Sequence, residues 1–486
     1  MKKIKILLPI LALALFSCDD YVDINQSPND PTPESVTPNL ALAAAISEPF
    51  RTFSTTSNEL GNVWMQNWGA NVNTTTGGYA TEYTLGINST FRAGIWDNTY
   101  LTVANLQNII TRNTTVYDNH KAIAKIMKVF YMQYIVDLYG NVPYSLAWDQ
   151  TNYAPAYDDD QAIYRSFIVE LKEAMDLIEN ADVSDATVGP EDVVFQGNLD
   201  NWEKFANTLR LRVLLRESEV SASSSYLATE FALLNGAEFL TADAAINPGY
   251  SADNAFKQNP FYGYFYNIDG SPRQNQDFIK ATSFVLNFLD STSDPRKQRL
   301  YAPATGTTYV GVVQGATAPE TPDNLSSVGP ALLQSASQNG YLITAAESYF
   351  LQSEAAFRGY LGGDAKTLFE SGIQASFLLD GLTVAQFNTY LTAISTTNGA
   401  GWDASSNKIQ AIMTQKWVAL NGRNGIESFI EHNRTGFPVV PLATTSQYPT
   451  LPLRLFYPTS EYTGNAANVP NLTIAQMFSE GPFWAN

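Results

Sequence analysis

The chain has 486 residues, a formal net charge of −19 and a single cysteine. A surface this acidic excludes nucleic-acid binding through clustered Lys and Arg, and an anionic lipid surface would repel it. One cysteine excludes an internal disulfide, so the fold must depend on its hydrophobic core, which a chain of this length supplies readily.

The first 17 residues predict a secretory signal, because three lysines lie among the first five residues and an apolar run covers residues 6–16. That run is roughly half as long as a helix must be to cross a bilayer. The sequence Leu15-Phe16-Ser17-Cys18 resembles the lipobox of bacterial lipoproteins, in which the cysteine becomes the N-terminus and carries the lipid. We therefore expect Cys18 to be the lipid attachment site. The alternative is an ordinary signal peptide with a stray cysteine nearby.

Residues 18–39 are rich in Asp, Asn and Pro and predict a flexible tether between the lipid and the folded body. Removal of the signal takes away three lysines and no acid, which changes the net charge from −19 to −22. Charge therefore cannot hold this chain at a membrane, and no later segment is apolar for long enough to cross one.

Apolar residues spaced three and four apart predict a mostly helical, all-α fold. The strongest pattern covers Ala122–Leu138, and the acidic run Asp158–Asp160 predicts an N-cap for the helix that follows it. The expected helices cover, in chain order, residues 40–67, 91–110, 122–138, 163–178, 201–219, 226–234, 341–360, 365–379, 384–394, 407–420 and 425–432.

Short turns such as Gly362-Gly363-Asp364 join these helices into pairs, which indicates stacked hairpins similar to tetratricopeptide units within one domain over residues 40–486. A loop-rich insertion interrupts the pairs at about residues 240–340, with one clear helix near Phe278–Leu289. Long irregular segments are usually functional. The proline-rich last 50 residues predict extended chain on the surface.

The sequence lacks the residue motifs of most common catalytic sites. The two histidines, His120 and His432, exclude a three-histidine zinc site, and we interpret His432 as structural. No G-x-S-x-G, P-loop or EF-hand motif occurs. A glycosidase carboxylate pair among the 47 acids and a calcium ion bound by scattered loop oxygens stay open as alternatives.

Two segments carry the side chains that sugar binding needs, namely aromatic rings for the apolar ring face and amides or charges for the hydroxyls. The first runs from Trp64 through a Thr- and Gly-rich loop to Tyr83. Trp64 falls on the apolar stripe and is expected in the core. The candidate ligand-binding residues of this segment are Asn67, Trp68, Asn71 and Tyr79.

The second segment is the run NPFYGYFY over residues 259–266. Five aromatic residues in six positions of an expected loop cannot all be buried easily. The candidates here are Tyr264, Tyr266 and, a few residues later, Arg273. The other reading of these aromatics is that they pack the loop against the body.

Several motifs spread along the chain carry a family resemblance. They are Cys18-Asp19-Asp20-Tyr21-Val22-Asp23, NVWMQNW at 62–68, DLYGNVPYS at 137–145, AAESYFLQSEAAFRG at 345–359, IESFIEHNRTGFP at 426–438 and PLRLFYPTSEYTGNAANV at 452–469. Their order and coverage resemble the SusD/RagB outer-membrane nutrient-binding lipoproteins of Bacteroidetes, in the SusD-like branch. A Trp-x-x-x-Arg-Arg helix usual in that family is replaced here by IESFIEHNR, which we interpret as drift at a structural position.

The resemblance implies a tetratricopeptide-like scaffold whose long loops hold the ligand, with no enzymatic activity and no cofactor. It also implies a cell-surface lipoprotein of the outer membrane that passes an oligosaccharide, or in some branches a peptide, to a SusC-like TonB-dependent transporter. The acidic pair after Cys18 resembles the signal for export to the outer face. Residues 240–340 and 440–470 are both candidates for contact with the transporter. A surface glycoside hydrolase is the less favoured alternative.

Overall fold

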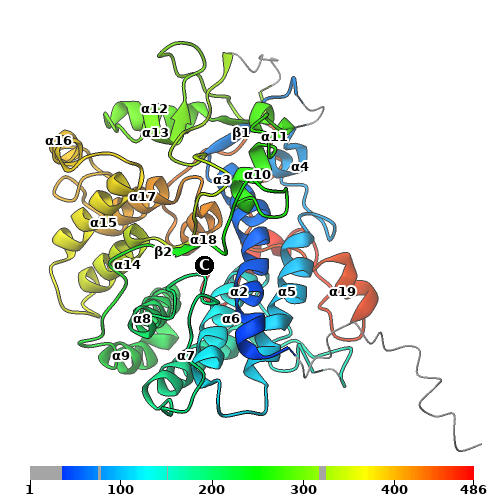
Figure 1. The fold of residues 1–486 in the computed structure, drawn as a ribbon. Coiled ribbons are helices and arrows are strands. Elements are labelled where there is room, and N and C mark those ends of the chain that lie inside the picture. Colours follow the sequence, from blue (N-terminus) through cyan, green and yellow to red (C-terminus); the bar gives the residue numbers. More distant parts are fainter. Residues whose placement is uncertain (1–35, 75–77, 150, 317–323, 486) are drawn as a thin grey trace, which may run out of the picture.

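The computed structural model describes residues 36–74, 78–149, 151–316 and 324–485. Cys18, the signal segment and nearly all of the expected tether lie outside these residues. The chain forms a mostly helical body with a few short strands (Figure 1). The all-α prediction is therefore confirmed. Within the described part of the chain, no helix has both the length and the apolar character needed to cross a membrane.

The helices of the first half are α2 (Pro38–Thr52), the π-helix η2 (Phe53–Ser57), α3 (Asn58–Trp64), α4 (Ala80–Thr84), α5 (Gly94–Ile110), α6 (Asp118–Tyr139), α7 (Asp160–Glu179), α8 (Leu199–Arg216), the 3₁₀ turn η3 (Ser221–Ser223) and α9 (Ser224–Ala232). The later helices are α10 (Pro260–Phe265), α11 (Gln274–Phe278), α12 (Ser283–Ser291), α13 (Lys297–Leu300), α14 (Ala345–Phe357), α15 (Ala365–Leu379), α16 (Val384–Ile394), α17 (Lys408–Leu420), α18 (Gly425–Thr435), α19 (Thr459–Gly464) and α20 (Gln476–Ser479).

The helical pairs match the sequence pattern closely. The strongest predicted helix is α6, which packs between α5 and α7 and is buried along nearly its whole length. The predicted acidic cap is present, since the Asp159 side chain accepts a hydrogen bond from the amide of Ala162 at the start of α7. The pair α14 and α15 is joined as expected, and Asp364 caps α15.

Short strands replace helix in two places. The single helix predicted at Phe278–Leu289 is confirmed only from Ser283 onward, as α12, because α11 ends at Phe278 and strand β3 (Ile279–Ala281) lies between the two helices. The Thr282 side chain then caps α12 by accepting from the amide of Val285. The helix expected from residue 341 begins only with α14, because residues 340–343 form strand β6 (Gly340–Ile343).

Two small antiparallel sheets result. The larger sheet has the order β1 (Trp68–Ala70), β3, β5 (Ser327–Val328) and β4 (Tyr301–Ala302), and Trp68 lies opposite Ala281. The smaller sheet pairs β6 with β2 (Ala244–Ile246). Hydrogen bonds between strands that are distant in sequence thus fix the insertion against the body, although sequence periodicity showed no strand there.

The C-terminal segment is more deeply packed than the proline pattern predicts. The Trp484 side chain is fully buried, and its indole N–H donates to Asp137 in α6 over 3.0 Å. Tyr457 and Met477 are buried as well. The prediction of extended surface chain is therefore wrong for these anchor residues, which bind the tail to the helical core.

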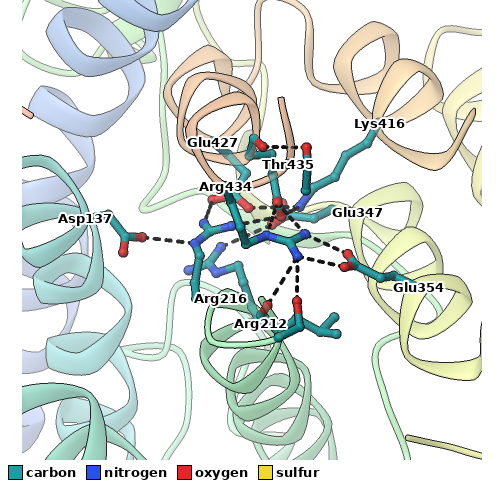
Figure 2. A network of polar contacts seen from close by, with 12 residues as sticks. Asp137, Arg212, Arg216, Glu347, Glu354, Lys416, Glu427, Arg434 and Thr435 are labelled. Atoms are coloured by element: carbon teal, nitrogen blue, oxygen red, sulfur yellow. Dashed lines mark hydrogen bonds and ion pairs between the residues drawn. The ribbon is translucent and has the colours of Figure 1, made fainter. Parts of the chain in front are cut away.

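A buried network of charged side chains joins five helices (Figure 2). From α18, Glu427 and Glu431 accept from Arg216 of α8 over 2.5 and 2.8 Å. Arg434 of the same helix holds Glu354 of α14 through two contacts of 2.7 Å. Further members come from α6, α8, α14 and α17: Asp137, Arg212, Glu347, Arg358 and Lys416.

Opposite charges in this network are balanced, with five carboxylates facing five cations. Burial on its own would raise the pKa of Glu431, but Arg434, Lys416 and Arg216 outweigh it and hold that pKa well below its usual range. Asp137 shows the other outcome, since burial raises its pKa to about 6 against the opposing effect of Arg216. Loss of one partner would leave an uncompensated charge in the core.

We predict that Glu431→Gln lowers the free energy of unfolding at pH 7 by about 3–5 kcal/mol, the usual cost of breaking a buried ion pair. The pKa of Glu431 is lower in the folded protein than its unfolded value of about 4.5. Its stabilising contribution is therefore complete at neutral pH and is lost as the pH falls below about 4.5.

Urea unfolding followed by circular dichroism at pH 7 and pH 4 measures both effects. The matched control is Asp403→Asn, which breaks the exposed contact between Asp403 and Lys366 and should change stability little. Equal stability losses in the two variants would contradict a central role of the network.

Candidate functional site

The two aromatic segments identified in the sequence come together at one end of the molecule. In Figure 1, β1, α10 and α11 lie close together there. The Trp68 ring packs against the rings of Phe261 and Phe265, with centroids 6.2 Å away in both cases. The backbone amide of Asn71 donates to the carbonyl of Phe278, which joins the first segment to the end of α11.

Four of the seven sequence candidates lie beneath the surface. Asn67, Trp68, Asn71 and Tyr79 are at most 3% exposed. They carry hydrogen bonds and ring contacts within the chain, so they support the surface from below. Direct ligand contact by these four stays a prediction that their burial does not favour. Trp64 is in the core, as predicted.

A buried polar cluster centred on Glu59 fixes α10 in place. The Glu59 carboxylate accepts from the hydroxyl of Tyr79 over 2.7 Å and from that of Tyr264 over 3.1 Å. Arg92 pairs with Glu59 and also with Glu82. Two sequence candidates from different segments therefore meet at one carboxylate that the sequence did not single out.

The electrostatics of this cluster keep the tyrosines protonated and the arginine charged. Burial, reinforced by Glu59, raises the pKa of Tyr79 and of Tyr264. Burial opposes the charge of Arg92, but Glu59 and Glu82 outweigh it and raise the pKa of Arg92. The cluster is thus a fixed support for α10 across the physiological pH range.

The exposed face of α10 presents a pair of stacked tyrosines. The expected loop is in fact a short helix, because Asn259 caps it and Pro260 occupies its first turn. Tyr266 directly follows α10 with an extended backbone, and its ring stacks on that of Tyr262, with centroids 5.1 Å apart and planes 25° apart. Both rings are half-buried. Tyr262 was missed in the sequence, although the Asn-Pro start could have signalled the helix.

Polar side chains border this tyrosine pair. The amide of Gln276 donates to the Tyr266 hydroxyl over 3.1 Å. The guanidinium of Arg273 is exposed and donates to the Tyr266 carbonyl over 3.3 Å. Tyr262, Tyr266, Arg273 and Gln276 are called the tyrosine platform below.

A shallow hollow lies between residues 70–72 and the segment 311–313. It encloses about 590 Å³, its open mouth included. Asn71 lines it, and the side-chain amide of Asn71 reaches the carbonyl of Asp277 over 3.4 Å. Loops from three parts of the chain thus form one uneven surface at this end.

The two histidines lie outside this surface and have structural partners. His432 Nδ1 lies 2.9 Å from the carbonyl oxygen of Pro438, and burial lowers the pKa of the imidazole. His120 contacts Glu191 over 3.0 Å. Over the described residues, no group of three His, Cys, Asp or Glu side chains is arranged to hold a metal ion.

Comparison with known proteins identifies the family. The model of the SusD-like family described as "Starch-binding associating with outer membrane" matches residues 28–458. The chain therefore belongs to the SusD/RagB family, as the sequence motifs predicted. A search of curated proteins gives no match.

Solved structures agree in fold. A chitin-binding protein is 26% identical, with a TM-score of 0.72 over 89% of this chain and 95% of its own. A chitin-binding SusD homologue from Flavobacterium johnsoniae is 24% identical, with a TM-score of 0.71 over 92% of this chain and 95% of its own. A SusD/RagB family protein from Bacteroides thetaiotaomicron is 20% identical, with a TM-score of 0.73 over 93% and 99%.

We predict that Trp68→Ala destabilises the protein by about 3–5 kcal/mol, because it removes a buried indole from between Phe261 and Phe265. Tyr266→Ala should cost much less, since that ring is half exposed. Thermal unfolding of the two variants makes the comparison. Equal stability losses would show that Tyr266 is part of the core and not of a free surface.

Proposed function

We propose that this protein binds oligosaccharide at the tyrosine platform and takes part in glycan uptake at the cell surface. The observation that carries the proposal is the stacked pair Tyr262 and Tyr266, whose half-exposed rings offer an apolar face wide enough for a sugar ring. The apolar face of a pyranose stacks on such rings. Membership of a family described as starch-binding supports it, as do chitin-binding proteins of the same fold.

The polar side chains beside the rings suit sugar hydroxyls. Arg273 supplies N–H donors, while Gln276 and Asn275 supply amides that both donate and accept. Asn275 is held in place because its amide donates to the carbonyl of Tyr264. A preformed edge of this kind reduces the entropy lost on binding.

The site favours sugar binding over sugar hydrolysis. A glycosidase needs one carboxylic acid and one carboxylate facing the scissile bond. Glu59, which contacts α10 through Tyr264, and Glu82 are buried and share Arg92. They are therefore already paired within the protein, which favours a structural role.

We predict that Tyr266→Ala weakens oligosaccharide binding roughly tenfold, which corresponds to about 1.5 kcal/mol for the loss of one apolar ring contact. Isothermal titration with chitooligosaccharides, maltooligosaccharides and a panel of plant and host glycans is the measurement. Tyr448→Ala is the matched control, since Tyr448 is also half-buried and stacked, on Phe478, but lies in the C-terminal segment.

Binding to no glycan in the panel would remove the carbohydrate proposal. Binding of a mixed peptide pool in its place would favour the peptide-binding alternative. Release of reducing sugar by the purified protein would favour the hydrolase.

We further propose that the protein is anchored to the outer membrane by a lipid on Cys18 and delivers its ligand to a SusC-like TonB-dependent transporter. The lipobox-like sequence and the acidic residues after it support the anchor. The family model, described as associating with the outer membrane, supports the location.

Cys18→Ala is expected to move the protein from the membrane fraction to the soluble fraction and to abolish labelling by radioactive palmitate. Ser17→Ala keeps a small residue before the cysteine and should leave both unchanged. Affinity purification of the wild-type protein from detergent-solubilised membranes should recover a β-barrel partner. Membrane retention of Cys18→Ala would contradict the lipid anchor.

A further inference from the structure

An arginine with free N–H groups lies at the border of the tyrosine platform. The Arg273 side chain is exposed, and its Nε donates to the carbonyl of Tyr266 over 3.3 Å. Nη1 and Nη2 have no hydrogen-bond partner among the described residues. One nitrogen of the guanidinium is thus held by the chain, while the other two are available to a bound molecule.

A tight turn fixes the backbone that carries this arginine. Tyr266 and Pro272 form an antiparallel bridge, and the amide of Arg273 donates to the carbonyl of Phe265 over 2.7 Å. Gly270 lies in the turn with a φ of +78°, which glycine adopts without strain. Arg273 is therefore attached to the same short piece of backbone as Tyr266, so the charge stays beside the platform.

The acids nearest in sequence do not neutralise Arg273. Asp269, in the same turn, accepts from the amide of Ser271 over 2.9 Å and from its hydroxyl over 2.6 Å. These hydrogen bonds lower the pKa of Asp269 and engage its carboxylate within the turn. No ion pair joins Arg273 to Asp269, to Asp277 of α11 or to any other carboxylate of the described residues.

An unpaired arginine is uncommon in this chain. Most lysines and arginines of the described residues form ion pairs, including partly exposed ones such as Lys172 and Lys366. The chain has 47 acids and 28 bases, but water and salt screen the charges of distant acids beyond about 8 Å. The net negative charge therefore does not prevent an anion from binding beside Arg273.

The free part of the guanidinium suits a carboxylate. Its N–H groups lie in one plane and can form two parallel hydrogen bonds with the two oxygens of a carboxylate. A neutral hydroxyl brings no opposite charge and accepts less well. Asn275 and Gln276 add neutral amides beside Arg273. The border of the platform thus offers one charged contact among neutral ones.

A uronic acid combines the two features that this surface can recognise. Its pyranose ring has an apolar face that stacks on the rings of Tyr262 and Tyr266. Its carboxylate is attached at C5 and projects from the edge of the ring. A sugar ring that lies flat on the tyrosines therefore directs the carboxylate sideways, to the border where Arg273 is attached.

We propose that the tyrosine platform selects acidic oligosaccharides, in which a uronic acid unit stacks on Tyr262 and Tyr266 while its carboxylate binds Nη1 and Nη2 of Arg273. The inference rests on the proposed carbohydrate function and adds the class of substrate. Arg273 determines the specificity, because the two tyrosines accept the apolar face of a neutral sugar equally well.

Isothermal titration of the full folded protein with matched ligands tests the proposal. The ligands are tetramers of galacturonic acid and of glucuronic acid, and the same tetramers after reduction of their carboxylates to primary alcohols. At least one acidic tetramer should bind about tenfold or more tightly than its reduced form, because a hydrogen bond to a charged group is stronger than a neutral one.

Arg273→Gln should weaken the binding of that acidic tetramer about ten- to a hundredfold and change the binding of its reduced form less than about twofold. Arg273→Lys keeps the charge but lacks the planar fork, and its affinity should lie between those of the wild type and Arg273→Gln. The matched control is Lys366→Gln, which removes one positive charge from α15, well apart from α10 in Figure 1. It should leave both affinities unchanged, and thermal unfolding checks that each variant is folded.

The proposal is overturned if the reduced tetramers bind as tightly as the acidic ones, or if Arg273→Gln binds the acidic tetramer as the wild type does. Tighter binding of a sulfated galactose tetramer than of both uronic acid tetramers overturns the assignment of a carboxylate. Binding of neutral oligosaccharides alone removes the acidic substrate class and leaves the proposed carbohydrate function in place. Binding of no oligosaccharide removes both.

Discussion

The buried charge network is the constraint on which the scaffold depends. Arg216 contacts three carboxylates from two other helices, and Arg434 joins α18 to α14. Because most of these charges are buried, the ion pairs favour the helix positions in which each charge meets its partner. The helices that surround the network are therefore fixed relative to one another before any loop is considered.

A fixed scaffold allows irregular segments to hold a site without moving. The Glu59 cluster is a smaller example, since Glu59 accepts from Tyr264 of α10 and from Tyr79 at the start of α4. The half-buried Tyr262 in α10 and Tyr266 directly after it are thereby presented on a fixed base. Strand pairing between β1 and β3 adds a third attachment. Ligand recognition by such a surface depends on preorganised groups and little on rearrangement.

Sequence periodicity located the helices because their apolar faces repeat every three or four residues, as in α6 and α15. It did not locate β3 or β6, since three or four residues are too few for a period and their partners lie far away in the chain. Composition located the aromatic segments, but it could not show which of their rings are buried. Trp68 is buried beneath the surface, whereas Tyr266 is half-buried and forms part of it. Glu59 could not be found, because its role depends on three partners brought together only by the tertiary fold. The motif IESFIEHNR, interpreted as drift at a structural position, supplies Glu427, Glu431 and Arg434 to the network.

The burial of Trp484 has a consequence for the order of folding. Its indole N–H and the guanidinium of Arg216 both reach Asp137, so residues separated by about 350 positions complete one polar site. Contacts of such long range form late and slow the folding of a chain. The polar site around Asp137 in α6 is thus incomplete until the segment that carries Trp484 has packed against it. Replacement of Trp484 by a residue without an N–H donor would leave the buried Asp137 carboxylate with two of its three donors, the Tyr164 hydroxyl and the Arg216 guanidinium.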